Sequence, residues 1–113
     1  MITLTNFVVG SQLTTSAATY ATMGANEKGT ITSAKLVNTT ATPYTATVHV
    51  ISAGATETTA NRDISARTIN PGETYKCPEL IGVQMMATGT IRALAEANSA
   101  ITFKVSGYIT TNG

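Results

Sequence analysis

The side chains that could do chemistry in this chain are few and far apart in the sequence. Its single histidine is His49 and its single cysteine is Cys77. A histidine can bind a metal ion or move a proton near neutral pH. However, a metal site needs three or four donors, and no Cys or Asp lies at ligand spacing from His49. We therefore expect His49 to be a strand residue on the more polar face of its strand, and we assign no metal site.

Cys77 stands between Lys76 and Pro78, and a neighbouring lysine can lower the pKa of a thiol. A catalytic thiol also needs a base, and no motif links His49 to this cysteine. Free cysteines are usually small, buried hydrophobic residues. We therefore expect Cys77 to be buried rather than nucleophilic.

Glu73 and Glu79 are the nearest approach to a pair of catalytic carboxylates. We expect them instead to be turn and loop residues, with Glu73 accepting hydrogen bonds from local backbone donors after Pro71 and Gly72. The sequence has no phosphate-binding loop, no Gly-x-Gly-x-x-Gly and no serine nucleophile elbow. We therefore predict no catalytic residue and no cofactor, and we do not expect an enzyme.

The composition favours strands and leaves little charge for the surface. Threonine occupies 23 of 113 positions, and the chain has seven basic and six acidic residues. A soluble monomer usually carries more surface charge, so we expect copies of the chain or a partner to cover part of this surface. The basic residues are dispersed, whereas nucleic acid binding needs a basic patch. We therefore expect no nucleic acid partner.

Several other classes are disfavoured by what the sequence lacks. No stretch approaches the roughly 18 apolar residues of a membrane span, and residues 1–9 have no basic leader. A lone cysteine does not imply an oxidising compartment, so we expect synthesis in a cytoplasm. With six aromatic residues and no tryptophan, a sugar-binding platform is not indicated, nor is any other small-molecule substrate.

Turn signals recur at short intervals between runs rich in Thr, Val and Ile, which is typical of an all-β sandwich or barrel. We predict a single antiparallel β-sandwich over residues 21–113, either immunoglobulin-like or a jelly roll. Residues 26–29 and 70–73 are predicted turns, the second of type II. In the clearest strand we place Tyr44, Ala46, Val48 and Val50 inward. Strands are expected at 31–39, 44–53, 62–69, 73–77, 89–95 and 100–110, with a polar loop at 54–61.

Residues 1–20 are uncharged and lack a firm pattern after Val9. They could form a first strand followed by a loop, or an arm that packs on a neighbouring molecule. Arg62, Asp63 and Arg67 form the densest charge group, which could bridge to another copy or be a solvated strand edge that discourages aggregation. The candidate interface residues are Phe7, Val8, Val9, Arg62, Asp63 and Arg67.

One ordered set of segments resembles a known group of proteins. These are small β-sandwich virion proteins encoded near the structural genes of tailed bacteriophages, and some look like capsid decoration, or cement, proteins. The resemblance is carried by 36–40 (LVNTT), 47–51 (TVHVI), 67–75 (RTINPGETY), 77–82 (CPELIG), 91–95 (IRALA) and 103–107 (FKVSG).

This resemblance implies a non-enzymatic structural protein on the capsid surface of a virion, bound to the phage head in many copies. The partners would be the major capsid protein and further copies of the chain, for example in a trimer. The alternative is a neck, tail or fibre component that acts as a host-surface binding module through its loops.

Overall fold

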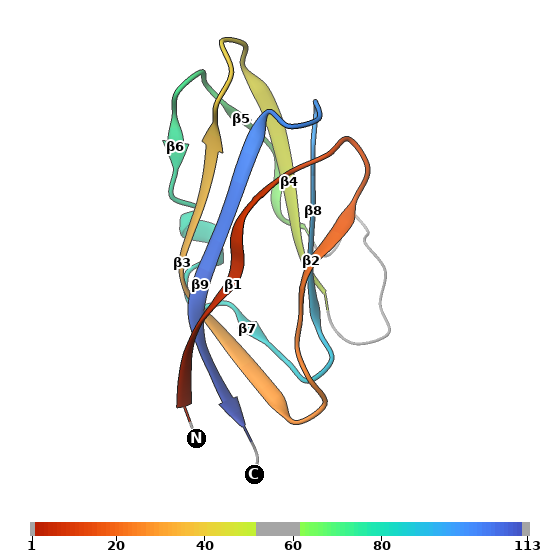
Figure 1. Cartoon of the computed structure of the whole chain (residues 1–113), viewed down its shortest axis with the longest axis vertical. Coiled ribbons are helices and arrows are strands. Elements are labelled where there is room, and N and C mark those ends of the chain that lie inside the picture. Colours follow the sequence, from red (N-terminus) through yellow and green to blue (C-terminus); the bar gives the residue numbers. More distant parts are fainter. Residues whose placement is uncertain (1, 52–61, 112–113) are drawn as a thin grey trace.

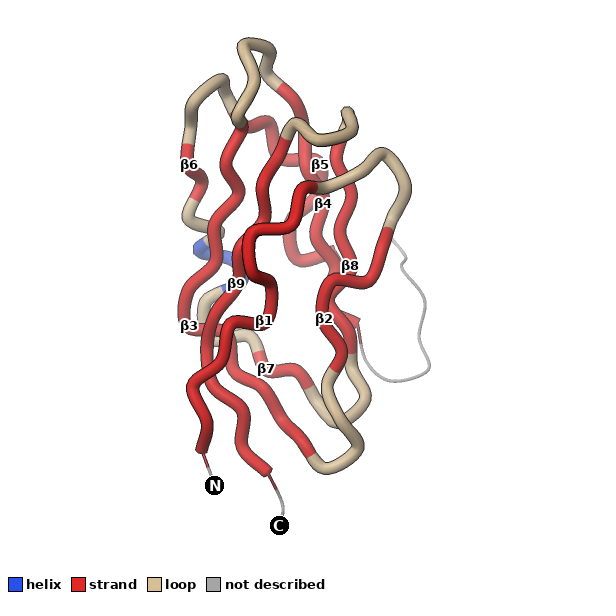
Figure 2. The backbone as a smooth tube through the Cα atoms, in the orientation of Figure 1, coloured by secondary structure: helices blue, strands red, loops and turns tan. Residues whose placement is uncertain are grey.

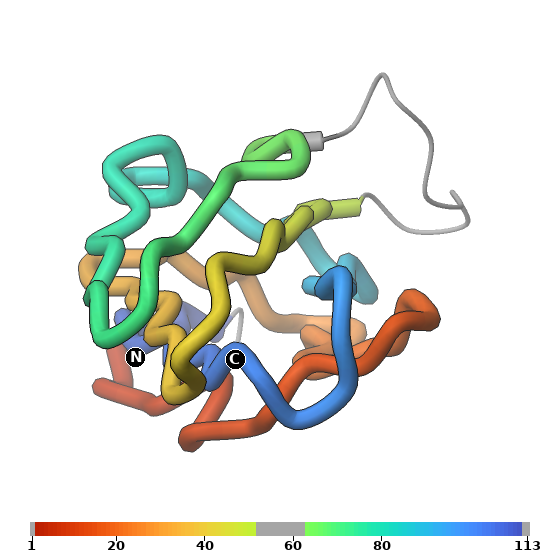
Figure 3. Tube along the Cα trace, turned by 90° about the horizontal axis from the view of Figure 1, so that it is seen from above, coloured from red at the N-terminus to blue at the C-terminus, as the bar shows by residue number. Residues whose placement is uncertain are grey.

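The computed structural model describes residues 2–51 and 62–111, which form two antiparallel sheets packed face to face (Figures 1 and 3). Nearly all of the described chain outside the turns is strand, with a single 3-10 turn (Figure 2). The prediction of a single all-β antiparallel sandwich is therefore confirmed. The elements are β1 (Ile2–Gln12), β2 (Ala18–Thr22), β3 (Glu27–Asn38), β4 (Tyr44–Ile51), β5 (Arg62–Ile69), β6 (Thr74–Tyr75), η2 (Pro78–Leu80), β7 (Gln84–Met85), β8 (Thr90–Ala95) and β9 (Ile101–Thr111).

The two sheets have different strand orders. The five-stranded sheet runs β1-β9-β3-β6, with β7 also pairing with β3, and the four-stranded sheet runs β2-β8-β4-β5. The long strand β9 therefore lies between β1 and β3 in the middle of the larger sheet. The polar loop predicted at 54–61 lies outside the described residues.

The core lies between the sheets and is built from alternate residues of each strand. The ring of Tyr20 meets Phe103 edge-on, with ring centres 6.2 Å apart and planes at 89°, a favoured arrangement for aromatic pairs. Burial of each large aliphatic side chain stabilises the fold by about 1.5–3 kcal/mol. The largest fully buried side chains are Leu13, Ile31, Leu36, Val48, Ile64, Ile69, Leu80, Met85, Ile91, Ile101, Phe103 and Val105.

Residues 2–22 contribute an edge strand to each sheet. β1 pairs with β9 from Ile2, opposite Thr110, to Gln12, opposite Thr102, with two register shifts along the way. β2 pairs with β8 in the other sheet. Of the two alternatives for residues 1–20, a strand followed by a loop is the one that the structure has, and a second strand begins at Ala18.

Two turn predictions have different outcomes. At Asn70–Glu73 the N–H of Glu73 donates to the carbonyl of Asn70 at 2.9 Å, and Gly72 has φ 73°. These features confirm the type II turn. The turn predicted over 26–29 is wrong by two residues, because the N–H of Glu27 donates to the carbonyl of Gly24 at 3.3 Å and β3 already begins at Glu27. The carboxylate of Glu27 accepts the N–H of Gly24 at 2.7 Å, so the chain reverses earlier.

Strand β4 is buried on both faces, whereas its alternating sequence pattern predicts that only one face is buried. Ala46 and Val48 point into the core as predicted, but Thr47, His49 and Ile51 are buried too. β4 lies between β8 and β5, and its register with β5 shifts on both sides of Val48. The buried Thr47 hydroxyl accepts the N–H of Ala66 at 3.0 Å, so β5 supplies a hydrogen-bond partner to a polar side chain that does not face solvent.

Asn38 is a fully buried polar side chain that ties the two sheets together. Its amide nitrogen donates to the carbonyls of Thr42, at 2.8 Å, and Ile69, at 2.9 Å. Its amide oxygen accepts the backbone N–H of Thr40 at 2.9 Å and the Thr40 hydroxyl at 2.7 Å. All four hydrogen-bonding positions of the amide are used. Asn38 ends β3 in one sheet, whereas Ile69 ends β5 in the other.

We predict that Asn38→Asp destabilises the fold strongly at neutral pH. The carboxylate keeps the acceptor but loses both donors and faces two carbonyl oxygens, so the free energy of unfolding should fall by about 3 kcal/mol or more. Urea unfolding measures this change. The control is Asn98→Asp, which keeps the acceptor for the N–H of Thr15 and should change stability by less than about 0.5 kcal/mol. Equal effects of the two changes would contradict this role of Asn38.

Candidate interaction surface

The structure does not bring His49 and Cys77 into a reactive arrangement. His49 is buried in β4, and Cys77 is buried just before η2. Burial raises the pKa of the Cys77 thiol to about 12, and the negative charge of Glu79 acts in the same direction. Among the described residues, no three or more His, Cys, Asp and Glu side chains gather where they could hold a metal ion.

The two glutamates considered as a catalytic pair serve local structure instead. The carboxylate of Glu73 accepts the N–H of Asn70 at 2.8 Å, so it caps the turn as the sequence predicts. The carboxylate of Glu79 accepts the hydroxyl hydrogen bond of Tyr75.

The two described charged side chains of β5, Asp63 and Arg67, make different contacts. The Arg67 guanidinium lies 4.4 Å from the centre of the Tyr75 ring, a cation–π contact. Asp63 is half-buried and accepts the N–H of Val50 at 2.9 Å. Burial raises the pKa of Asp63, against the opposing effects of this hydrogen bond and of His49. The side chain of Arg62 lies outside the described residues.

The three apolar candidates of β1 have three different environments. Phe7 packs against the core where β3 and β9 carry glycines: a Cβ on Gly29 or Gly107 would stand 3.0 Å from its ring. Val8 is buried, and only Val9 is open to solvent, with 79% of its surface exposed. A register shift between Asn6 and Val8 separates these side chains.

The outer face of the five-stranded sheet carries an apolar row that the sequence reading missed. Ile2 is 67% exposed and Leu4 is 84% exposed, and Val9 lies further along the same strand. The sequence signal for this row is the alternation of apolar and polar residues over Ile2–Thr5, which has the period of a strand. Thr3 is exposed as well, so the start of β1 is open on both faces. We call Ile2, Leu4 and Val9 the β1 apolar row.

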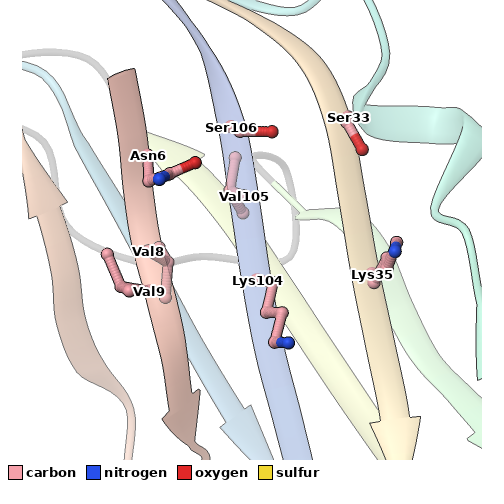
Figure 4. A pocket seen from close by; sticks show the side chains of 8 residues that line it. All are labelled: Asn6, Val8, Val9, Ser33, Lys35, Lys104, Val105 and Ser106. Carbon is pink, nitrogen blue, oxygen red and sulfur yellow. The ribbon is translucent and has the colours of Figure 1, made fainter.

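Beside this row the outer face is hollowed into a shallow depression of about 310 Å³ across β1, β9 and β3 (Figure 4). Lys104 on β9 stands directly opposite Val9 on one side and Lys35 on the other. The lining is therefore amphipathic, and its residues are Asn6, Val8, Val9, Ser33, Lys35, Lys104, Val105 and Ser106.

Comparison of the chain with protein-family models, with curated proteins and with solved structures found no match. Among the described residues, no helix is long and apolar enough to cross a membrane. The shape and chemistry of the surface therefore carry the functional argument.

We predict that the Cys77 thiol of the folded protein is nearly inert. With a pKa of about 12, its thiolate fraction at pH 8 is roughly a thousandfold below that of an ordinary cysteine with a pKa near 8.5. Modification by an aromatic disulfide reagent at pH 8 should be slower by at least that factor than modification of the urea-unfolded chain. Comparable rates in the two states would restore Cys77 as a candidate nucleophile.

Proposed function

We propose that this chain is a non-enzymatic virion structural protein, a capsid decoration protein that binds and stabilises a phage head in many copies. The observation that carries the proposal is the exposed β1 apolar row on an edge strand of a sandwich with few charges. Large exposed apolar side chains close together are characteristic of interaction sites. The segments between residues 36 and 107 that resemble small β-sandwich virion proteins, some of which look like decoration proteins, support the same proposal.

The free edge of β1 is the natural place for contact between molecules. An edge strand presents unpaired N–H and C=O groups that can add a strand from another chain. The register with β9 is regular from Ile2 to Asn6 and shifts after Asn6 and again after Val9. Bulges of this kind interrupt strand pairing, so Ile2–Asn6 is the part of the edge best suited to a partner strand.

Contacts at this edge fit both proposed partners, a second copy of the chain and the major capsid protein. Pairing of Ile2–Asn6 with a partner strand would satisfy backbone groups of the edge and cover part of Ile2 and Leu4. Each contact is small, but a shell presents many equivalent sites, and closed oligomers multiply weak contacts.

The loops at the opposite end of the sandwich favour a second candidate, a neck, tail or fibre component that binds a host surface. Both chain ends lie together at one end, whereas the β3–β4, β5–β6 and β8–β9 loops gather at the other (Figure 1). Clustered loops on a rigid scaffold are a common site for binding.

Quantitative mass spectrometry of purified virions of the encoding phage separates these functions. We expect hundreds of copies of the chain per particle, measured against the major capsid protein, if it decorates the head. About a dozen copies would favour the neck or tail, where symmetry limits the number of sites. Absence from the particle would overturn both virion functions.

We predict that Leu4→Glu weakens binding to the particle, because it places a charge where an apolar side chain becomes buried. Loss of about 2 kcal/mol of apolar burial corresponds to about a thirtyfold weaker Kd, measured by co-sedimentation with particles that lack the protein. The matched control is Thr3→Glu, which adds the same charge at the next residue, on the other face of the strand. Equal binding by Leu4→Glu and wild type would remove the β1 apolar row from the interface.

A further inference from the structure

The lysines of this chain are dispersed in the sequence but gather on one face of the folded protein. Lys28 and Lys35 lie on β3, Lys104 lies on β9, and Lys76 follows β6. Lys28 shares the register row of Ile2 and Thr110, and Lys35 shares the row of Val9 and Lys104. Both rows lie on the outer side of the five-stranded sheet.

Three of these lysines form a continuous row across the sheet. Lys104 and Lys35 are direct cross-strand partners, and Figure 4 shows Lys104 on the strand between those that carry Val9 and Lys35. Lys76 follows Tyr75, the partner of Leu36, and it lines a second depression together with Lys35. We call Lys104, Lys35 and Lys76 the lysine row.

This arrangement is unfavourable for the isolated molecule. Like charges directly opposite each other on adjacent strands are destabilising. None of the four lysine ammonium groups has a hydrogen bond or an ion pair with any described residue. The lysine row therefore has no internal neutralising partner within the described chain.

The described carboxylates are used elsewhere. Each one accepts a hydrogen bond from a nearby donor: the N–H of Gly24, Val50, Asn70 or Thr45, or the Tyr75 hydroxyl. No carboxylate lines either depression beside the lysine row. The residues that accept these bonds are Glu27, Asp63, Glu73, Glu96 and Glu79.

We propose that the lysine row is the docking site for an acidic protein surface, whose Asp and Glu side chains neutralise it. The row is bordered by exposed Val9 on one side and half-exposed Ile81 on the other. Together with Asn6, Ser33 and Ser106 these residues offer apolar contact and hydrogen bonds as well as charge. This inference rests on the proposed function for the identity of the partner, the particle subunit beneath the sandwich.

A protein partner fits this surface better than a nucleic acid. Nucleic acid sites generally combine arginines with aromatic side chains on which bases stack. Neither residue type lines the two depressions beside the lysine row. Complementary charge across a protein interface fixes orientation and speeds association, which is what a protein binding many equivalent sites requires.

The test compares a variant of the row with a matched control on the same face. The variant is Lys35→Gln, Lys76→Gln and Lys104→Gln combined, and the control is Lys28→Gln. Lys28 pairs with Thr110, six positions from Lys104 along β9, or about 20 Å at roughly 3.4 Å per residue. All four side chains are exposed, so both proteins should fold, and the melting temperature of the variant should equal or exceed that of the wild type.

Binding to particles that lack the protein should be about tenfold weaker for the triple variant, since three exposed ion pairs are lost. Binding by Lys28→Gln should be unchanged. Raising the salt from about 0.1 M to about 1 M shortens the screening length from about 10 Å to about 3 Å, so it should weaken the wild type and scarcely affect the variant. If the triple variant binds the particles as tightly as the wild type does, this inference is overturned, whereas the proposed function still stands.

A second assay keeps the inference testable if the wild type does not bind particles, a result that would overturn the proposed function. Poly-L-glutamate and a DNA duplex serve as defined probes of the wild type and the triple variant. Salt-sensitive binding of poly-L-glutamate that is lost in the variant supports an acidic protein partner. The inference is overturned if the wild type does not bind poly-L-glutamate, or if it binds the DNA duplex as tightly as it binds poly-L-glutamate.

Discussion

The fold depends on the amide of Asn38, because one buried side chain joins the ends of strands in both sheets. The amide closes the β3–β4 connection through Thr40 and Thr42 and reaches across to Ile69 at the end of β5. The backbone of Asn38 also accepts from Gly72 and donates to Glu73, so the type II turn is held against the same residue. Since a buried amide is costly unless every group is paired, this network defines one relative position of the sheets.

The sequence predicts the features of the fold that are local. The alternation in β9 and the Asn-Pro-Gly-Glu turn are recognisable because a strand or a turn is specified by residues a few positions apart. The burial of Thr47 in β4 is not local, since its hydroxyl accepts the N–H of Ala66 from β5, 19 residues away. Asn38 looks like an ordinary polar residue at a strand end, and only the return of Ile69 from 31 residues away makes it a link between sheets.

The candidate interaction surface also depends on tertiary structure, which the sequence does not predict. Phe7, Val8 and Val9 are consecutive apolar residues, yet one packs over glycines, one enters the core and one faces solvent, because β1 bulges between them. The lysines are dispersed along the chain, so the sequence predicts no basic patch. The register of β9 against β3 places Lys104 opposite Lys35, although they are 69 positions apart in the sequence. Neither the composition nor a local motif contains that information, because register between distant strands is a tertiary property.

Strand β1 combines two properties that usually conflict. A long apolar edge strand invites uncontrolled pairing with other chains, and proteins commonly limit this with bulges or charges. Here the bulges lie in the second half of β1, where Val9 adjoins the lysine row, while Ile2–Asn6 remains regular and open. Charge repulsion between copies at the lysine row would oppose stacking of this face on itself, but it would not oppose an acidic partner. The arrangement therefore favours a specific contact over general aggregation, as the proposed attachment to a particle would require.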